Sequence, residues 1–467
     1  MTDYSITLPS YSIGEQVYKQ IPTVCAPFGA TAVVIGGHKA MAAVRERLLA
    51  AIQGSAVTIT DFVWYGGEAC RENIAALAEN PAVAAADMIF AVGGGKALDT
   101  GKAYGEESGK PVFTFPTIAS TCAATTAVSI LYHADGTFLA PDFHKAPPVH
   151  AFILPSVIAA APRRYIWAGM GDTYAKYFEA EMSSRGEALV HYHALGVNVS
   201  RMCLDPLLTY GAQAMADIDA EHCTYAVEQV ILAIIVTTGI ASILLTAEHI
   251  VDYNSGLAHA VFYALTAWPH IEARHLHGEV VGFGVLILLL TDGNLDGFRQ
   301  MYAFNRSVGL PTALSQVEMT GADVEKLNAR LFESRSHARI TAERMAMESL
   351  EYYFNDLCAV ICLTWDQIES SGVAGAELED LTSLPRSIEG VEVGLTYRQQ
   401  RDGSFRISVR TSGNIDACNI ARRLGGGGHA RAAGCEISGN LDNAKHAVLE
   451  EVRKELQRCG LLDQDAG

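Results

Sequence analysis

The sequence predicts an α/β domain at the N-terminus, an all-helical domain in the middle and a smaller α/β domain at the C-terminus. In roughly the first 160 residues, short apolar runs alternate with segments of helical periodicity. From Pro162 to about Leu314 the periodicity is helical almost throughout. After about Leu327 the pattern predicts one or two amphipathic helices over residues 328–354, and then strands in "LCAVICLT", "VEVGLTYRQ" and "FRISVRTS". These changes predict three domains, at residues 1–162, 163–326 and 327–467.

The bulk properties fit a globular protein with large cores. Hydrophobic residues make up 49% of the 467 residues and charged residues 18%. The net charge of −18 argues against a protein that coats nucleic acids in general. A local basic face remains compatible with this charge. The ten cysteines form no CxxC pair, and the N-terminal residues lack a basic segment followed by an apolar one. We therefore expect a cytoplasmic protein with reduced thiols, and we expect Cys358 and Cys362, which lie in an apolar run, to be buried free thiols.

The N-terminal domain is expected to hold a parallel sheet with helices on both faces. Four apolar runs bounded by glycine or proline are typical of buried strands, and helical segments separate the first three of them. The runs are Thr31–Gly37, Met88–Gly95, Pro111–Thr117 and His150–Pro155.

Three glycines, Gly93–Gly95, stand between a predicted strand and a predicted helix. Backbone N–H groups at such a helix start bind phosphate well, and Lys96 adds a cation. The turn is no Walker loop, because five residues separate Gly95 from Gly101 and Ala103 replaces the magnesium-binding Ser or Thr. It does not match GxGxxG either. A phosphate-binding turn is favoured over a glycine turn without a ligand.

The uncharged run Val230–Ala247 is at the lower length limit for a membrane helix. Gly239, Ser242 and several threonines dilute its hydrophobicity, and no basic flank anchors it. A helix buried on all sides within the middle domain is the favoured interpretation, so no membrane association is expected.

Two histidines, His259 and His277, could converge on one point. Pro269 breaks the stretch between them, which indicates two helices joined by a loop. Asp172 in "GMGDTYAKYFEAE" is the best carboxylate elsewhere, and we expect it at a helix N-terminus, after two glycines that leave room for a substrate. An N-cap is the alternative role for Asp172. A catalytic zinc or iron(II) site takes about three such ligands, but two histidines alone would not favour one.

Several motifs together resemble the iron-containing alcohol dehydrogenase superfamily, most closely its glycerol dehydrogenases and hydroxycarboxylate dehydrogenases. The order and spacing are shared by "WYGGEACRENI", "GGGKALDTGKA", "FPTIASTCAATTAVSILY", "AGMGDTYAKYFEA", "GLAHAVFYALTAWP" and "HLHGEVVGFG". The resemblance covers about residues 5–320. It implies an α/β Rossmann-like N-terminal domain, an all-helical metal-binding domain and a cleft between them.

The resemblance also implies the chemistry. Asp172, His259 and His277 would hold one divalent metal, zinc or iron, while His270 and His275 would have no ligand role. The metal would act as a Lewis acid on the substrate oxygen, and hydride would pass to the nicotinamide of NAD or NADP. The cofactor would lie along Gly37, Gly94, Gly95, Lys96, Thr117, Ser120, Thr126, Val128 and Tyr132. We expect a metal-dependent NAD(P) oxidoreductase that acts on a small polyol, hydroxy acid or keto acid and forms a homo-oligomer.

Three positions depart from the family pattern. Cys122 stands where glycerol dehydrogenases have a substrate-contacting Asp, which resembles the hydroxycarboxylate branch. Phe262 stands where a second histidine usually follows the first metal-binding one. The side chains of Cys122 and Phe262 are expected to line the substrate pocket. Gly37 replaces the acidic residue that accepts the ribose 2′-OH, with His38 and Lys39 beside it. This third change predicts that NADP(H) is accepted.

The likeness to dehydrogenases fades after "VGLPTALSQVEM", so the helical domain is expected to be truncated. The tail "FRISVRTSGNIDACNIARRLGGGGHARAAG" resembles the C-terminal substrate-binding domain of DHH-family phosphoesterases, such as nanoRNases and 3′-phosphoadenosine phosphate phosphatases. Arg406, Ser408 and Arg410 alternate on one face of a predicted strand, and arginine suits bidentate phosphate binding. The expected phosphate contacts are Arg410, Gly426, Gly427, Gly428 and His429. A glycine-rich turn with solvated arginines is the alternative.

No DHH tripeptide occurs in the chain, so the tail is expected to bind a nucleotide or short RNA end without hydrolysing it. This leaves an alternative function for the whole protein. It would bind nucleotides or RNA ends through the GGGGH domain, and its dehydrogenase part would be an inactive scaffold. A dehydrogenase inactivated by truncation of its helical domain is a third possibility.

Overall fold

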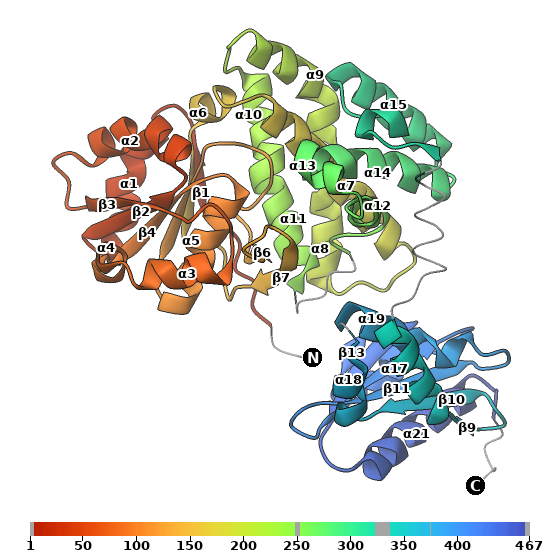
Figure 1. Cartoon of the computed structure of the whole chain (residues 1–467). Coiled ribbons are helices and arrows are strands. Elements are labelled where there is room, and N and C mark those ends of the chain that lie inside the picture. Colours follow the sequence, from red (N-terminus) through yellow and green to blue (C-terminus); the bar gives the residue numbers. More distant parts are fainter. Residues whose placement is uncertain (1–3, 248–252, 322, 324–336, 374, 463–467) are drawn as a thin grey trace. The chain divides into compact units, whose positions relative to one another are not determined.

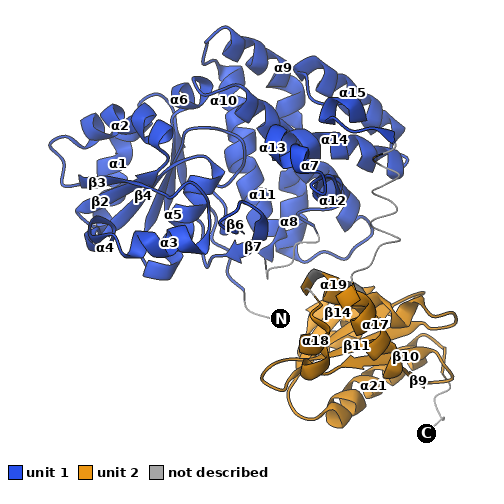
Figure 2. Cartoon of the chain, viewed as in Figure 1, with its two compact units in different colours: residues 1–321 blue, residues 322–467 orange. Residues whose placement is uncertain are grey.

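The computed structural model describes residues 4–247, 253–321, 323, 337–373 and 375–462. The chain forms two compact units, Met1–Gly321 and Ala322–Gly467 (Figure 2). The predicted boundary after residue 326 lies outside the described residues, and the division at residue 162 within the first unit stays a prediction.

The first unit contains a six-stranded sheet in the order β1-β8-β5-β4-β2-β3, with every pairing parallel (Figure 1). The four predicted strands are confirmed as β2, β4, β5 and β8. The short β1 and the half-exposed β3 lack a continuous buried apolar run, and for this reason periodicity did not predict them. The strands are β1 (Tyr11–Ile13), β2 (Thr31–Gly36), β3 (Thr58–Trp64), β4 (Met88–Gly93), β5 (Val112–Pro116) and β8 (His150–Ile153).

Helices cover both faces of this sheet, as predicted. Buried residues of α2 pack with Val34 and Phe90 on one face, whereas Gly101 of α5 lies against Ala91 on the other. The helices are α1 (Ile21–Cys25), α2 (His38–Ile52), α3 (Arg71–Ala78), α4 (Pro81–Ala85), α5 (Gly95–Ser108) and α6 (Pro155–Ala159). A hairpin that the sequence analysis missed, β6 (Val128–Tyr132) and β7 (Phe138–Phe143), follows β5.

The winding of the sheet reverses beside β2. The chain places β3 on one side of β2 and then β4 on the other. Both β2 and β4 end in glycine, and after a single N-cap glycine the helices α2 and α5 start. Ligands of open parallel sheets bind at the carboxyl ends of strands at such a reversal.

The rest of the first unit is helical, in agreement with the prediction. Its helices are α7 (Arg164–Ser184), α8 (His191–Ser200), α9 (Asp205–Asp219), α10 (Tyr225–Leu232), α11 (Thr238–Leu245), α12 (Leu257–Leu265), α13 (Pro269–Arg274), α14 (His277–Thr291) and α15 (Leu295–Val308). A π-helical turn, Ala233–Thr237, joins α10 to α11. The resulting helix Tyr225–Leu245 is long and apolar enough to cross a membrane, but 67% of its most apolar window is buried inside the structure. That burial agrees with the predicted core helix.

The second unit contains a sheet in the order β13-β14-β12-β11-β10-β9, in which only β10 and β11 pair in parallel. Three of its strands confirm the predicted apolar runs. The strands are β9 (Glu351–Tyr353), β10 (Cys358–Leu363), β11 (Val393–Gln399), β12 (Phe405–Thr411), β13 (Gly427–Gly428) and β14 (Ala432–Ile437).

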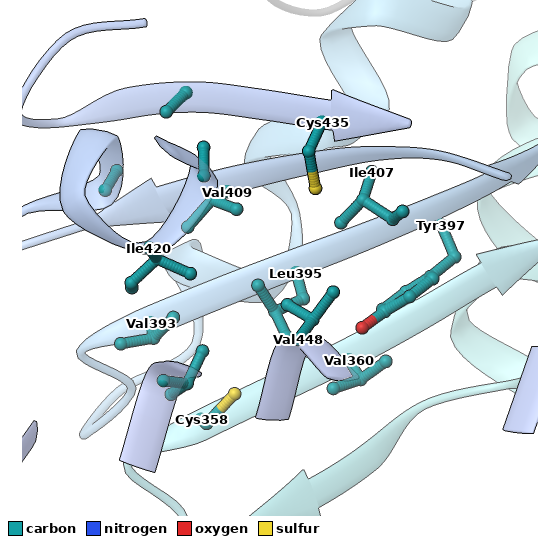
Figure 3. Packing of buried hydrophobic residues seen from close by; sticks show 14 of the residues in the cluster. Cys358, Val360, Val393, Leu395, Tyr397, Ile407, Val409, Ile420, Cys435 and Val448 are labelled. Atoms are coloured by element: carbon teal, nitrogen blue, oxygen red, sulfur yellow. The ribbon is translucent and has the colours of Figure 1, made fainter. Parts of the chain in front are cut away.

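Within the described residues, five α-helices accompany this sheet: α17 (His337–Glu348), α18 (Trp365–Ser371), α19 (Gly375–Asp380), α20 (Ala417–Arg422) and α21 (Leu441–Arg458). The helical segment predicted over residues 328–354 contains α17 and ends in the short strand β9, and its residues 328–336 lie outside the described residues. Figure 3 shows the core, where Val448 of α21 packs with Leu395 and Val360 of the sheet. Cys358 and Cys362 are buried thiols of this core, as predicted.

Candidate metal and cofactor site

Asp172 lies well inside α7, so the prediction that it stands at a helix N-terminus was wrong. The glycines before it do not leave room for a substrate either. A Cβ on Gly171 would lie 2.0 Å from the backbone oxygen of Gly278, and one on Gly278 would lie 2.1 Å from the oxygen of Ala168. These glycines let the backbones of α7 and α14 approach each other, which brings Asp172 next to the start of α14.

The structure brings Asp172, His259 and His277 together. One ligand atom from each lies within 4.8 Å of the other two. Oδ1 of Asp172 is 3.4 Å from Nε2 of His259 and 3.5 Å from Nε2 of His277. His259 is in the first turn of α12 and His277 begins α14. A carboxylate and two imidazole nitrogens facing one point fit a three-ligand zinc or iron(II) site.

Electrostatics favour an ionised carboxylate at this point. Burial raises the pKa of Asp172, but hydrogen bonds and charges from His259 and His277 outweigh it and hold the pKa well below its usual range. Burial lowers the pKa of His259, yet the charge of Glu179, followed by the hydrogen bonds to Asp172 and Glu179, raises it to about 9. The negative charges of Asp172 and Glu179 that raise the pKa of His259 also attract a cation, which would take the place of the proton on Nε2.

Sequence analysis missed Glu179, which contacts the ring nitrogen of His259 that faces away from Asp172. Its Oε2 is 2.7 Å from Nδ1 of His259, and its Oε1 accepts the backbone N–H groups of Gly256 and His259. Glu179 is two helical turns after Asp172 on α7. That spacing was a signal in the sequence, because residues seven apart share one face of a helix.

Phe262 and Cys122, the two residues predicted to line the pocket, bring uncharged side chains to this cluster. The ring of Phe262 stands edge-on to the ring of His277, with centroids 4.4 Å apart. Burial, together with the charge of Asp172, raises the pKa of the Cys122 thiol to about 11, so this thiol stays protonated. His270 and His275 are not in the ligand set. His275 instead pairs with Glu279, 2.8 Å away.

The predicted cofactor residues gather at the carboxyl ends of β2, β4 and β5. Gly37 and Gly94 are the N-cap residues of α2 and α5. The backbone N–H of Thr117 donates to the oxygen of Gly93 over 3.0 Å, which places the end of β5 beside the glycine turn. Lys96 contacts Glu68 at 2.5 Å and lies 4.9 Å from the ring centroid of Tyr132.

The segment that carries Ser120, Thr126 and Val128 is held by two buried side chains that the sequence analysis did not single out. Lys102 donates to Oγ1 of Thr126 over 3.1 Å and to the oxygen of Val128, and it pairs with Asp99 at 2.9 Å. The Thr125 hydroxyl donates to the oxygen of Ile235 in the π-helical turn. These contacts fix the segment between the sheet and the helices.

In the second unit, Arg406, Ser408 and Arg410 share one face of β12, opposite Arg398, Thr396 and Gly394 of β11. The glycine run has a structural use. A Cβ on Gly426 would lie 2.1 Å from the oxygen of Gly434, and one on Gly428 would lie 2.5 Å from Cα of Ala433.

These close contacts let β13 pair with β14. The backbone N–H of His429 closes the turn by donating to the oxygen of Ala432 over 2.7 Å.

Two family models match the chain. One describes iron-containing alcohol dehydrogenases and matches residues 9–162, and the other describes the DHHA1 domain and matches residues 357–457.

Among curated proteins, glycerol dehydrogenase of Thermotoga maritima is 34% identical over 271 residues, which cover 56% of this chain and 71% of that protein. Hydroxycarboxylate dehydrogenase A of Escherichia coli is 33% identical over 246 residues, covering 52% of this chain and 67% of that protein.

Solved structures share the fold of the first unit. A probable glycerol dehydrogenase from Sinorhizobium meliloti superposes with a TM-score of 0.60 and 28% identity, covering 70% of this chain and 89% of that one. Sulfoacetaldehyde reductase from Bifidobacterium kashiwanohense, solved with NAD⁺, superposes with a TM-score of 0.54 at 19% identity, covering 70% of this chain and 91% of that one.

Proposed function

The chain belongs to the iron-containing alcohol dehydrogenase family, and from this membership we propose that it is a metal-dependent oxidoreductase that transfers hydride between NAD(P) and a small polyol, hydroxy acid or keto acid. Its glycerol dehydrogenase relatives support an NAD-linked oxidoreductase that acts on polyols. The observation that carries the metal role is the convergence of Asp172, His259 and His277 within 4.8 Å. Self-association and a cytoplasmic location stay predictions.

Each residue of the site has a distinct task in this proposal. Asp172, His259 and His277 would hold the cation, which supplies Lewis-acid polarisation of the substrate oxygen. Phe262 and Cys122 would line the pocket and exclude water from the reacting atoms. Because Cys122 is uncharged, unlike a carboxylate at this position, the pocket would accept substrates that bear their own negative charge. This favours hydroxy or keto acids over glycerol.

The proposal is tested by measuring metal content and by following nicotinamide absorbance over a panel of polyols, 2-hydroxy acids and 2-keto acids. Asp172→Asn and His277→Ala should lose the metal and at least about 100-fold in kcat/KM, because removing one of three ligands leaves the ion weakly bound. His270→Ala is the matched control, since His270 lies outside the ligand set, and it should keep both. A wild-type protein that binds no divalent metal would contradict the proposal.

The coenzyme pocket is proposed to accept NADP(H). The first turn of α2 holds no acidic residue, and its first residue, His38, is exposed and stacks on the ring of Trp64 at 5.4 Å. Lys39 follows it and is also exposed. A 2′-phosphate beside these residues would meet the ammonium group of Lys39 and the ring of His38 instead of a carboxylate. Fluorescence titration with NADPH and NADH should give comparable affinities or tighter NADPH binding, and Lys39→Asp should weaken NADPH selectively.

A second candidate function concerns the second unit, where the DHHA1 model matches. We propose that Arg410, His429 and the amides of Gly426, Gly427 and Gly428 bind the phosphate of a nucleotide or short RNA end. The shared face of Arg406, Ser408 and Arg410 on β12 supports this role. A labelled 5′-phosphorylated dinucleotide should bind the full chain, bind Arg410→Ala more weakly, and remain uncleaved.

A further inference from the structure

We propose that Glu179 is a positioning residue of the metal site: it holds His259 in the tautomer whose Nε2 is free to bind a cation. This inference rests on the proposed function, because it assigns Glu179 a role towards the same metal. The role is one of orientation, since Glu179 contacts His259 and not the point between the three ligand atoms.

The geometry around Glu179 is fully specified by hydrogen bonds. Its side chain is buried, and Oε2 lies 2.7 Å from Nδ1 of His259. Oε1 accepts from the backbone N–H groups of Gly256, over 2.8 Å, and His259, over 3.0 Å. The carboxylate therefore meets three donors from the N-terminal turn of α12 and its preceding residue. Together they fix both the ring and the start of the helix that carries it.

The tautomer follows from which nitrogen faces which group. Nε2 of His259 faces Asp172 at 3.4 Å and belongs to the ligand set, so it must carry no proton when a cation binds. A neutral imidazole has one N–H, which must then lie on Nδ1. An ionised carboxylate can only accept a hydrogen bond. Glu179 therefore selects the Nδ1–H form and increases the basicity of Nε2.

Lys176, on the same face of α7, completes the arrangement. Asp172, Lys176 and Glu179 are spaced by four and three residues, so their side chains leave one side of the helix. Lys176 is buried and donates to Asn254, to its side-chain oxygen over 2.7 Å and to its backbone oxygen. Lys176 thus supplies a positive charge near Glu179 and fastens the chain just before α12. One face of α7 therefore carries the proposed ligand Asp172, Lys176, which holds the chain before α12, and Glu179, which orients His259.

A second His–Glu pair shows what sets Glu179 apart. Glu279 pairs with Nδ1 of His275 at 2.8 Å, and its other oxygen accepts the backbone N–H of Leu276 over 3.1 Å. This pair caps α14, and His275 lies outside the ligand set. Contact between a carboxylate and an imidazole is thus not enough to assign a role at the metal site. The assignment of Glu179 depends on Nε2 of His259, the other ring nitrogen, which faces Asp172.

The test compares Glu179→Gln with Glu181→Gln in the full chain. Glu181 lies on the same helix, but its side chain is 41% exposed and pairs with Arg185, so it is a matched control. In Glu179→Gln the amide oxygen can still accept the two backbone N–H groups, which leaves the NH₂ group facing Nδ1. An NH₂ donor there favours the Nε2–H tautomer, which cannot bind metal. Zinc affinity, measured on metal-depleted protein against a chromogenic chelator, should fall roughly 10- to 100-fold.

Glu181→Gln should match wild type, and thermal melts of the metal-free proteins check that both variants fold. If Glu179→Gln does not fold, Glu179→Asp replaces it. The shorter side chain keeps the charge but cannot reach all three donors, so zinc affinity should fall by a smaller factor. Wild-type zinc affinity in a folded Glu179 variant would overturn the inference. A wild-type protein without zinc affinity is a separate result, which would contradict the proposed function itself.

Discussion

The positions of Asp172 and Glu179 on α7 show how single residues acquire their roles from a helix face. Asp172 is in the interior of the helix, where its backbone groups are already paired, so its carboxylate is available for the two imidazoles. Glu179 is buried, and its burial supports its role, because a carboxylate shielded from water stays hydrogen-bonded to one imidazole nitrogen. Neither role can be assigned from residue type alone.

His144 gives a pH-dependent contribution to stability that is independent of the metal site. Its Nε2 is 2.7 Å from Oγ of Ser129, which itself donates to the oxygen of Asp99 over 3.0 Å. The Ser129 oxygen is therefore the acceptor, and the ring is neutral with its proton on Nε2. Burial, with the nearby charge of Lys102, lowers the pKa of His144 to about 4, although Asp142 opposes the shift.

This depressed pKa predicts the direction of the pH effect. An unfolded histidine titrates near 6.5, so the unfolded state binds more protons than the folded state between about pH 6.5 and 4. The contribution of His144 is complete above pH 6.5 and is lost as the pH falls through this window, up to about 3 kcal/mol. Urea unfolding of wild type and His144→Gln at several pH values measures it. Equal pH dependence of the two proteins would show that His144 does not titrate as described.

At the scale of elements, the site depends on how closely α7 and α14 cross. The glycine-rich stretches around Gly171 and Gly278 have no side chain at the crossing, so backbone meets backbone. Thr125 and Gly239 make a similar close contact, since a Cβ on Gly239 would lie 2.0 Å from Oγ1 of Thr125. Glycines that look like breaks in helical periodicity are therefore packing sites.

Gly171→Ala should push α7 and α14 apart. The added Cβ would lie 2.0 Å from the oxygen of Gly278, a backbone atom that cannot rotate away. The expected cost is about 3 kcal/mol, the upper end for overpacked sites, and zinc affinity should fall with it because His277 begins α14. Gly375→Ala, at a position with nothing within 4 Å of the added Cβ, is the control and should be neutral within about 1 kcal/mol. Chemical denaturation and chelator competition measure both effects.

At the scale of the whole molecule, two compact units carry two different family resemblances. Each unit has buried clusters of its own, and those of the second unit consist of residues from Ala342 onward; Figure 3 shows part of one of them. The dehydrogenase residues all belong to the first unit and the predicted phosphate contacts to the second.

This division predicts how zinc affects unfolding. A ligand that binds only the folded state stabilises the unit that binds it, by about 2.7 kcal/mol at a concentration 100 times its Kd. Calorimetry of the metal-depleted chain should show two transitions. Zinc should raise the midpoint of only one, and the same transition should stay unmoved in Asp172→Asn. A shift of both transitions in parallel would mean that the units unfold together.

Sequence analysis alone predicted the strands β2, β4, β5 and β8, the helical middle region, and Asp172, His259 and His277 as candidate ligands. These follow from local properties: continuous apolar runs, helical periodicity, glycine turns and motifs with recognisable spacing. It misplaced Asp172 at a helix end and passed over β3, the hairpin β6–β7, Lys102 and Glu179.

The contact of Glu179 with His259, and the close approach of α7 and α14 at their glycines, became visible in the folded structure alone. These contacts join residues far apart in the chain, and local patterns carry no information on which helix faces meet. The physical reason is that the crossing is fixed by packing of backbones, whereas periodicity shows only that each helix has a face to bury.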